Sequence, residues 1–349
     1  MPLYPDQPAP LLDDAITLRQ LGSMHIGGRS ASLSGLPARD ITYSPGGPAV
    51  SLDPNGDFEI EQMYVQFAQL LKPRASHPLL MMHGGGMSGV TYETKPCRRP
   101  GWQAFFLRAG HDVWLADAVE RGRASWARSP EFFRGEAVFR SKQEAWELFR
   151  MGPPGSWHAE PSMRQAHDPM RFPVSAFDRF MKQSVPRWTS NDAATQAAYN
   201  ELARLHGPFV IVAHSQGCHF AFHMALAHPE KVRAIVALEP SGLAQVPDAH
   251  LSRLKAIPHL FVWGDHLMGH PLWSQLGPRL QAYRQRLQAQ GVQVDEWDLP
   301  ALGIRGNSHM LMMDDNSDEL AAHVHHWLHE QGLCQADDQA PSALSSASL

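Results

Sequence analysis

The sequence has few cysteines and no long apolar run. Its 349 residues include three cysteines, Cys97, Cys218 and Cys334, which are too few and too scattered for a disulfide framework or a zinc site. Because the number is odd, at least one thiol lacks a disulfide partner within the chain. No stretch approaches the roughly 18 consecutive apolar residues of a membrane span. We therefore expect no membrane-spanning segment.

The sequence also lacks a basic stripe and a recognisable leader. Its formal net charge is -5, and 30 Lys and Arg residues are interspersed with 35 Asp and Glu residues. This distribution argues against nucleic acid or an anionic membrane surface as a partner. The N-terminal residues MPLYPDQPAPLLDD do not contain a basic region followed by an apolar one, as a signal peptide would. A cytoplasmic protein is the expectation, and export stays open.

The apolar residues follow one pattern in the first part of the chain and a different pattern after it. Residues 16–71 contain short runs separated by Gly and Pro clusters, as antiparallel hairpins do. After them, short apolar runs alternate with helical patterns, which is typical of βαβ units and a mostly parallel sheet. The strands are expected at 78–83, 112–117, 209–214, 234–238, 259–263 and 292–297, and the helices at 102–109, 191–205, 216–227, 273–290 and 318–331.

One long interval interrupts this alternation. Residues 119–190 contain no good strand but many Trp and Phe side chains, and so long a loop inside a compact domain predicts structure of its own. We interpret it as a helical cap whose aromatic residues mostly fill a small core of their own. Residues 15–118 and 191–333 would then form the two parts of an α/β core. The proline-rich residues 1–14 are expected to be flexible, and the Ser- and Ala-rich residues 334–349 to be disordered.

A candidate nucleophile lies in the sequence Ala213-His214-Ser215-Gln216-Gly217, between a predicted strand and a predicted helix. This approximates the G-x-S-x-G motif, in which a sharp turn exposes the serine hydroxyl above the sheet. Small residues are needed two positions before and two after the serine because those positions nearly touch. Ala213 replaces the first glycine but is still small, so the motif predicts Ser215 as a nucleophile.

A glycine-rich loop follows the first predicted core strand. It reads His83-Gly84-Gly85-Gly86-Met87, and glycines let backbone N–H groups point into a site. The HGGG pattern is typical of an oxyanion loop, which acts together with the N–H of the residue after the nucleophile. We expect Gly85 and Gln216 to supply the two donors, with the register in the loop uncertain by one residue.

A candidate general base follows the last predicted strand, in the sequence Gly306-Asn307-Ser308-His309. A serine hydroxyl is a poor nucleophile until a base takes its proton, and an imidazole can do so at neutral pH. The chain has 20 histidines. His309 is preferred because it completes the chain order serine, acid, histidine of this class of site.

The ordered set of motifs is more specific than any one of them. It comprises MMHGGGMSGVTYET, DAVERGRAS, HSQG, VALEPSG, VWGDH and LPALGIRGNSHMLMMDDN. From about residue 79 to residue 328 the chain resembles an α/β-hydrolase, and in finer detail the bacterial carboxylesterases typified by esterase 713. The resemblance implies a Ser-Glu-His triad with Glu239 as the acid, and it makes a homodimer possible. The sequence departs from the family at Gly85 and Gly86, where family members have cysteines. Any chemistry of those cysteines is therefore not expected here.

The identity of the triad acid is open on the sequence alone. Asp265 ends the seventh strand, where most α/β-hydrolases have their acid, and Glu239 ends the sixth, as in the esterase 713 branch. The longer side chain of Glu239 suits a reach from a neighbouring strand, and the surrounding EPSG matches that branch. Glu239 is preferred, and Asp265 would then stabilise a turn.

These parts together predict a serine hydrolase that cleaves small-molecule carboxylic esters through an acyl-enzyme. The mechanism needs no metal and no cofactor. The same scaffold supports acyltransferases, amidases and lyases, so fold alone does not settle the reaction. A receptor that only binds small molecules could tolerate the loss of triad members, whereas here all three are present.

Two further groups of residues are expected to have no chemical role. Cys218, one turn into the helix after Ser215, is expected to be packed rather than reactive. Four histidines crowd the last predicted helix, and with no suitably spaced carboxylate or cysteine beside them we expect a solvated helix face rather than a metal site; they are His323, His325, His326 and His329.

Overall fold

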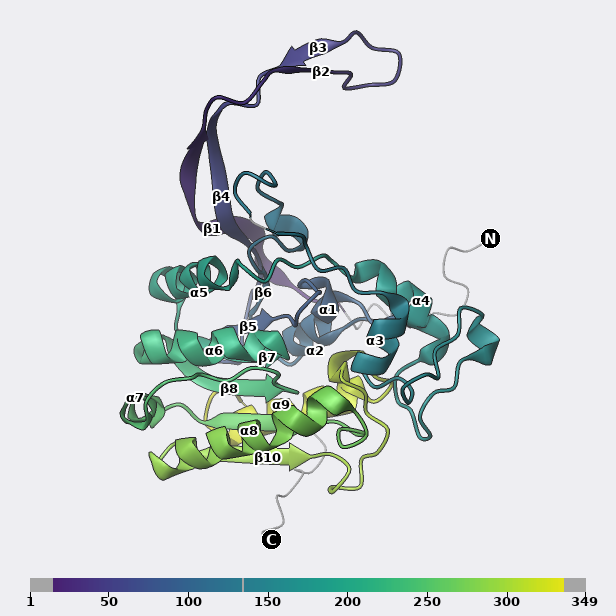
Figure 1. The fold of residues 1–349 in the computed structure, drawn as a ribbon. Helices are drawn as coiled ribbons and strands as arrows, with labels where there is room; N and C mark the ends of the chain where they lie inside the picture. The colour runs from purple at the N-terminus through teal and green to yellow at the C-terminus, as the bar shows by residue number, and fades with distance from the viewer. Residues whose placement is uncertain (1–14, 134, 336–349) are drawn as a thin grey trace.

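The computed structural model describes residues 15–133 and 135–335, which form an eight-stranded sheet covered by helices (Figure 1). The strand order is β1-β4-β6-β5-β7-β8-β9-β10. The six strands from β6 to β10 in this order are mutually parallel, and β4 pairs antiparallel with both β6 and β1. The parallel strands are β5 (Leu79–Met82), β6 (Val113–Asp117), β7 (Phe209–His214), β8 (Val232–Leu238), β9 (His259–Trp263) and β10 (Val294–Asp298).

The expected antiparallel region is one long hairpin. β1 (Leu18–Leu33) pairs with β4 (Gly56–Leu70), and at its tip β2 (Arg39–Ile41) pairs with β3 (Val50–Leu52). Figure 1 shows the hairpin leaving the body of the molecule. The half of β4 nearest the sheet is buried, whereas most of β1 is half-buried or exposed.

Helices cover both faces of the sheet because successive strand residues point to opposite sides. In β5, Leu80 and Met82 face one layer, and Leu79 and Met81 face the other. The first layer contains α5 (Asp192–His206), α6 (Gln216–Ala227), α7 (Asp248–Leu251) and α8 (Pro271–Ala289). The second contains α2 (Trp102–Arg108) and α9 (Ser317–Glu330), with the short α1 (Val90–Glu93) beside α2.

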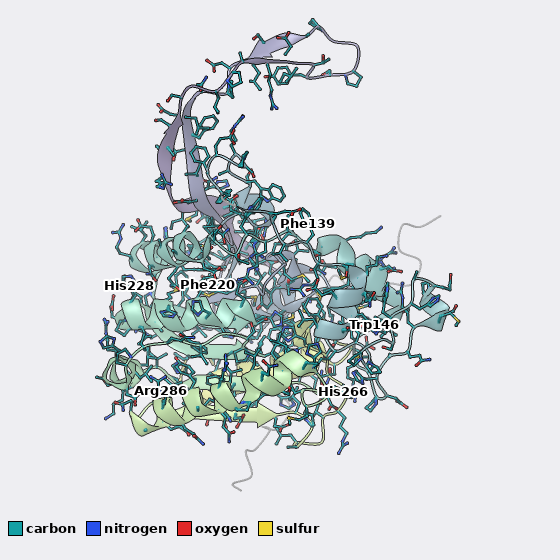
Figure 2. All side chains as sticks on the ribbon, viewed as in Figure 1. Phe139, Trp146, Phe220, His228, His266 and Arg286 are labelled. Carbon is teal, nitrogen blue, oxygen red and sulfur yellow. The ribbon has the colours of Figure 1, made fainter. Side chains whose placement is uncertain are left out.

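Short helices and loops occupy the interval that the sequence predicts as a cap. They include α3 (Lys142–Leu148), α4 (Phe177–Phe180) and several 3₁₀ turns. Most of its aromatic side chains do not form a separate core, contrary to expectation, because Trp146, Phe149 and Phe177 pack into the same apolar cluster as the sheet and α9. Phe133 and Trp188 form a small cluster apart, together with Ala137. Two aromatic residues in the described part of this interval are exposed, Phe139 at 66% (labelled in Figure 2) and Trp126 at 49%.

Several sequence expectations fall at the edges of the described residues. Residues 1–14 and 336–349, which the sequence predicts as flexible or disordered, lie outside them. Cys334 lies in the predicted tail, but its backbone forms an antiparallel β-bridge with that of Ala75. The structure therefore describes the first residues of that tail. Within the described part of the chain no helix is both long and apolar enough to cross a membrane. Cys218 is fully buried, as expected of a packed residue.

Candidate active site

Ser215 is the single residue between the end of β7 and the start of α6. Its backbone has φ 52° and ψ −117°, a combination that residues with a Cβ rarely adopt. The turn needs a glycine two residues later, because a Cβ on Gly217 would lie 2.7 Å from the carbonyl oxygen of His83. This tight turn places Ser215 at the carboxyl edge of the parallel strands, beside the point where the strand order reverses around β5.

His309 and Glu239 form a buried pair at the same edge. Nδ1 of His309 lies 3.0 Å from Oε2 of Glu239, and the residues are 2% and 0% exposed. Glu239 directly follows β8, and His309 lies in the loop between β10 and α9. The His309 backbone is held on both sides, because its N–H donates to the carbonyl of Phe149 and its own carbonyl accepts from Nε2 of His214.

The local charges favour an ionised Glu239 and a neutral His309. Burial raises the pKa of Glu239, but the guanidinium of Arg150 and the ring of His309 together lower it to about 2. Burial lowers the pKa of His309, and the hydrogen bond and charge of Glu239 oppose part of that shift. At neutral pH His309 therefore has one ring proton. Glu239 holds that proton on Nδ1, which leaves the Nε2 lone pair to act as a base.

Arg150 is a site residue that the sequence did not reveal. It comes from the predicted cap, two residues after the end of α3, and is 1% exposed. Its Nη2 donates to Oε1 of Glu239 at 2.7 Å, and its Nε donates to the carbonyl oxygen of Asp265 at 2.7 Å. The backbone N–H of Gly264 also donates to Oε1 of Glu239. All these contacts fix the carboxylate that faces His309.

The alternative acid, Asp265, has other partners. Its Oδ2 accepts from the backbone N–H of Gly306 at 3.0 Å, and its Oδ1 accepts from that of His266 at 2.7 Å. Gly306 lies three residues before His309. Asp265 therefore stabilises the loop that carries His309, whereas the carboxylate in contact with the imidazole is that of Glu239.

The glycine-rich loop lies against Ser215. A Cβ on Gly84 would be 3.1 Å from that of Ser215, and one on Gly85 would be 3.2 Å from Oε1 of Gln216. Nε2 of His83 accepts from the N–H of Ala118, so Nδ1 carries the ring proton and donates to the carbonyl of Gly84 at 2.8 Å. In a trans peptide the following N–H, that of Gly85, points the opposite way.

The hydroxyl of Ser215 donates to the hydroxyl of Ser241 at 3.2 Å, and among the described residues no hydrogen bond joins it to His309. Aromatic rings surround the imidazole of His309: the ring centroids of His214, Trp273 and Phe149 lie 4.5, 4.6 and 5.6 Å away. The sequence motifs gave no indication of Ser241, Trp273 or Phe149. Ser241 lies two residues after Glu239 in EPSG, which is the one signal that could have pointed to it.

Comparisons with known proteins agree with this architecture. Residues 77–273 match the model of the alpha/beta hydrolase fold family. The chain is 26% identical over 338 residues to Probable secreted lipase phiG from Fungal sp. (strain ATCC 74256), covering 79% of this chain and 88% of that protein. It is also similar to a solved novel bacterial esterase, with 29% identity, a TM-score of 0.77, and coverage of 94% of this chain and 99% of the other.

These similarities confirm the fold class and the resemblance to bacterial esterases that the motifs predict. The name of the fungal relative describes a secreted protein, so the comparisons do not support the expected cytoplasmic location. The family match covers more than half of the residues and includes Ser215 and Glu239. The chain therefore belongs to the alpha/beta hydrolase fold family.

Proposed function

We propose that this protein is a carboxylic ester hydrolase with Ser215 as nucleophile, His309 as general base and Glu239 as the orienting acid. The observation that carries the proposal is the buried bond between His309 Nδ1 and Glu239, placed at the strand edge where Ser215 occupies a strained turn. An esterase and a lipase among the similar proteins support the same class of substrate.

In the proposed first step, Ser215 attacks the acyl carbonyl while Nε2 of His309 takes its hydroxyl proton. The imidazolium that forms is stabilised by Glu239, which stays ionised because Arg150 and Gly264 also donate to it. The hydroxyl of Ser215 must first turn from Ser241 toward His309. His309 then gives its proton to the departing alcohol, and the acyl group stays on Ser215.

The oxyanion of the tetrahedral intermediate would accept from the backbone N–H groups of Gly85 and Gln216. Gln216 begins α6, and the first N–H groups of a helix have no partner within it. The N–H of Gly85 has no hydrogen-bond acceptor among the described residues. A water activated by His309 then attacks the acyl-enzyme, Ser215 recovers its proton, and the carboxylic acid leaves.

The test is hydrolysis of p-nitrophenyl and naphthyl esters of varied acyl length by wild type and by Ser215→Ala. Removing the nucleophile of such a triad costs about 10⁶ in kcat, so the variant should show no enzymatic turnover. The matched control is Ser241→Ala, which removes the hydroxyl that accepts from Ser215 but no proposed catalytic group, and should keep most of the activity.

Labelling with a fluorophosphonate supplies a second readout, because a nucleophilic serine becomes covalently modified. Wild type and Ser241→Ala should be labelled on Ser215, and Ser215→Ala should not be labelled. Folded Ser215→Ala that keeps more than a few per cent of the wild-type rate would contradict the assignment.

A further inference from the structure

Three metal-ligating side chains meet at the end of the sheet opposite Ser215. His111 lies two residues before β6, and His325 lies on α9. The backbone of Cys334 forms a β-bridge with that of Ala75, which lies four residues before β5. Parallel strands all begin at one edge and end at the other. Ser215 follows the end of β7, whereas this cluster lies where β5 and β6 begin, so the two groups are separated by the length of the strands.

Burial of two of the four α9 histidines contradicts the solvated helix face expected from the sequence: His323 and His325 are buried, whereas His326 and His329 are half-buried. His325 is 2% exposed and His111 is 1% exposed, while Cys334 is half-buried. The sequence pattern concealed the cluster because its members come from three separate parts of the chain. Only His325 belongs to the run of histidines on α9, and the cysteine that accompanies it follows nine residues later.

The ligand atoms converge at distances close to those of a tetrahedral site. Nε2 of His111 lies 2.9 Å and Sγ of Cys334 lies 3.6 Å from Nδ1 of His325, and all three atoms are within 4.8 Å of one another. Zinc bonds of about 2.0–2.1 Å to nitrogen and 2.3 Å to sulfur place tetrahedral ligands roughly 3.3–3.6 Å apart. To admit the ion, the nitrogen pair would widen by a few tenths of an ångström, and Nε2 of His111 and Sγ of Cys334, which lie within 4.8 Å of each other, would come to about 3.6 Å.

The rings are held in ligand orientation by their surroundings. The planes of His111 and His325 are nearly perpendicular, at 84°, and the edge of His111 meets Phe106.

We propose that His111, His325 and Cys334 form a Zn²⁺ site that ties the segment after α9 to the beginning of the sheet. Two imidazole nitrogens and one thiolate are a ligand set for zinc rather than for magnesium or calcium, which prefer oxygen. On binding, the Cys334 thiol loses its proton to solvent and a zinc–sulfur bond forms. The thiolate offsets one of the two positive charges of the ion, and a fourth ligand from solvent would complete the tetrahedron.

Metal binding moves one imidazole proton from one ring nitrogen to the other. Without metal, one N–H lies between Nε2 of His111 and Nδ1 of His325, whose separation is that of a hydrogen bond. Both atoms must offer lone pairs to the ion, so His111 would carry its proton on Nδ1 and His325 on Nε2. One Zn²⁺ therefore releases one proton per chain, from Cys334.

The test uses Co²⁺ as a probe, because a thiolate bound to Co²⁺ gives a near-ultraviolet charge-transfer band and tetrahedral Co²⁺ absorbs visible light. The metal-free full chain should bind one Co²⁺ with both signals, and Zn²⁺ should abolish them by displacement. Cys334→Ser should lose the charge-transfer band and weaken Zn²⁺ binding by more than about 100-fold. The matched control is Cys97→Ser, another half-buried cysteine, which should behave as wild type.

Thermal unfolding with and without Zn²⁺ separates a built site from binding by scattered surface histidines. Zn²⁺ should raise the Tm of wild type and of Cys97→Ser, but not that of Cys334→Ser, because only an ion bound to the folded state stabilises it. Wild-type protein that shows no charge-transfer band with Co²⁺ would overturn the proposal even if Cys334→Ser failed to fold. A Cys334→Ser variant that keeps the band would do the same.

Discussion

The guanidinium of Arg150 and the imidazole of His309 bind opposite oxygens of one buried carboxylate. Nη2 of Arg150 lies 2.7 Å from Oε1 of Glu239, and Nδ1 of His309 lies 3.0 Å from Oε2. Arg150 also holds the backbone of Asp265 and lies over the ring of Trp273. A residue of the predicted cap thus joins the two strand ends that could supply the triad acid.

Replacing Arg150 by methionine should lower kcat and also destabilise the protein. Removing one partner of a buried ion pair costs about 3–5 kcal/mol, because the other charge stays buried. Since Glu239 keeps its bonds to His309 and Gly264, the loss in kcat should be smaller than the roughly 10⁴-fold that follows loss of an orienting acid. Ester hydrolysis and denaturant unfolding measure the two effects.

The pH profile distinguishes a positioning role for Arg150 from a purely structural one. His309 must be neutral to act, so activity falls as pH decreases through its pKa, which burial lowers below 6.5 and which the positive charge of Arg150 lowers further. Arg150→Met removes that charge, so the acid limb of kcat/KM should move to higher pH. Arg164→Met is the matched control, because it removes a cap arginine paired with Asp178 and should leave the limb in place.

Glu239→Gln and Asp265→Asn should separate the two candidate acids. Glutamine cannot hold the Nδ1 proton of His309 as a carboxylate does, and the expected loss in kcat is about 10⁴-fold. Asp265→Asn weakens acceptors for the N–H groups of Gly306 and His266, so it should loosen the loop and cost at most about tenfold. Circular dichroism checks folding of both variants. A large loss confined to Asp265→Asn would make Asp265 the triad acid.

Gly85→Pro should reduce kcat by about 10²–10³ while changing KM little, because proline removes an N–H that we assign to the oxyanion. The matched control is Gly85→Ala, which keeps the N–H. Its Cβ would meet only the ends of two flexible side chains, Oε1 of Gln216 at 3.2 Å and Nη1 of Arg187 at 3.3 Å. Equal losses in the two variants would point to crowding instead of a missing donor.

The sequence predicted the parts of this molecule that repeat a local pattern. All six parallel strands and the five main helices were expected within a few residues of where they lie, since all but the acidic edge strand β10 are apolar runs or stripes bounded by Gly, Pro or polar residues. The motif residues Ser215, Glu239 and His309 follow the ends of their strands, which is why chain order and strand position together could nominate them.

Contacts between distant segments could not be predicted in the same way. Arg150 lies in no motif, and its link to Glu239 depends on how the cap folds back over the strand ends. The packing of the cap's aromatic residues on the sheet also depends on how the cap folds back, which no local pattern of residues shows. Similarly, the sequence of α9 predicts a solvated face for His325, because helical periodicity cannot show that His111 and Cys334, which belong to other segments, lie against it.

The strained backbone of Ser215 gives a prediction about stability that is independent of the substrate. With φ 52° and ψ −117°, any side chain crowds the backbone, and such residues cost about 1–3 kcal/mol. Glycine relieves this strain but adds about 0.5–1 kcal/mol of chain entropy in the unfolded state. Ser215→Gly should therefore be more stable than Ser215→Ala by about 1 kcal/mol, although both are inactive.

The matched comparison is Ser241→Gly with Ser241→Ala, two residues after Glu239, where the backbone φ is not positive. There glycine relieves no strain and only loosens the unfolded chain, so Ser241→Gly should be less stable than Ser241→Ala. Denaturant unfolding of the four variants measures both differences. If glycine destabilises both positions equally, Ser215 carries no strain, and the turn that presents the nucleophile is as relaxed as an ordinary loop.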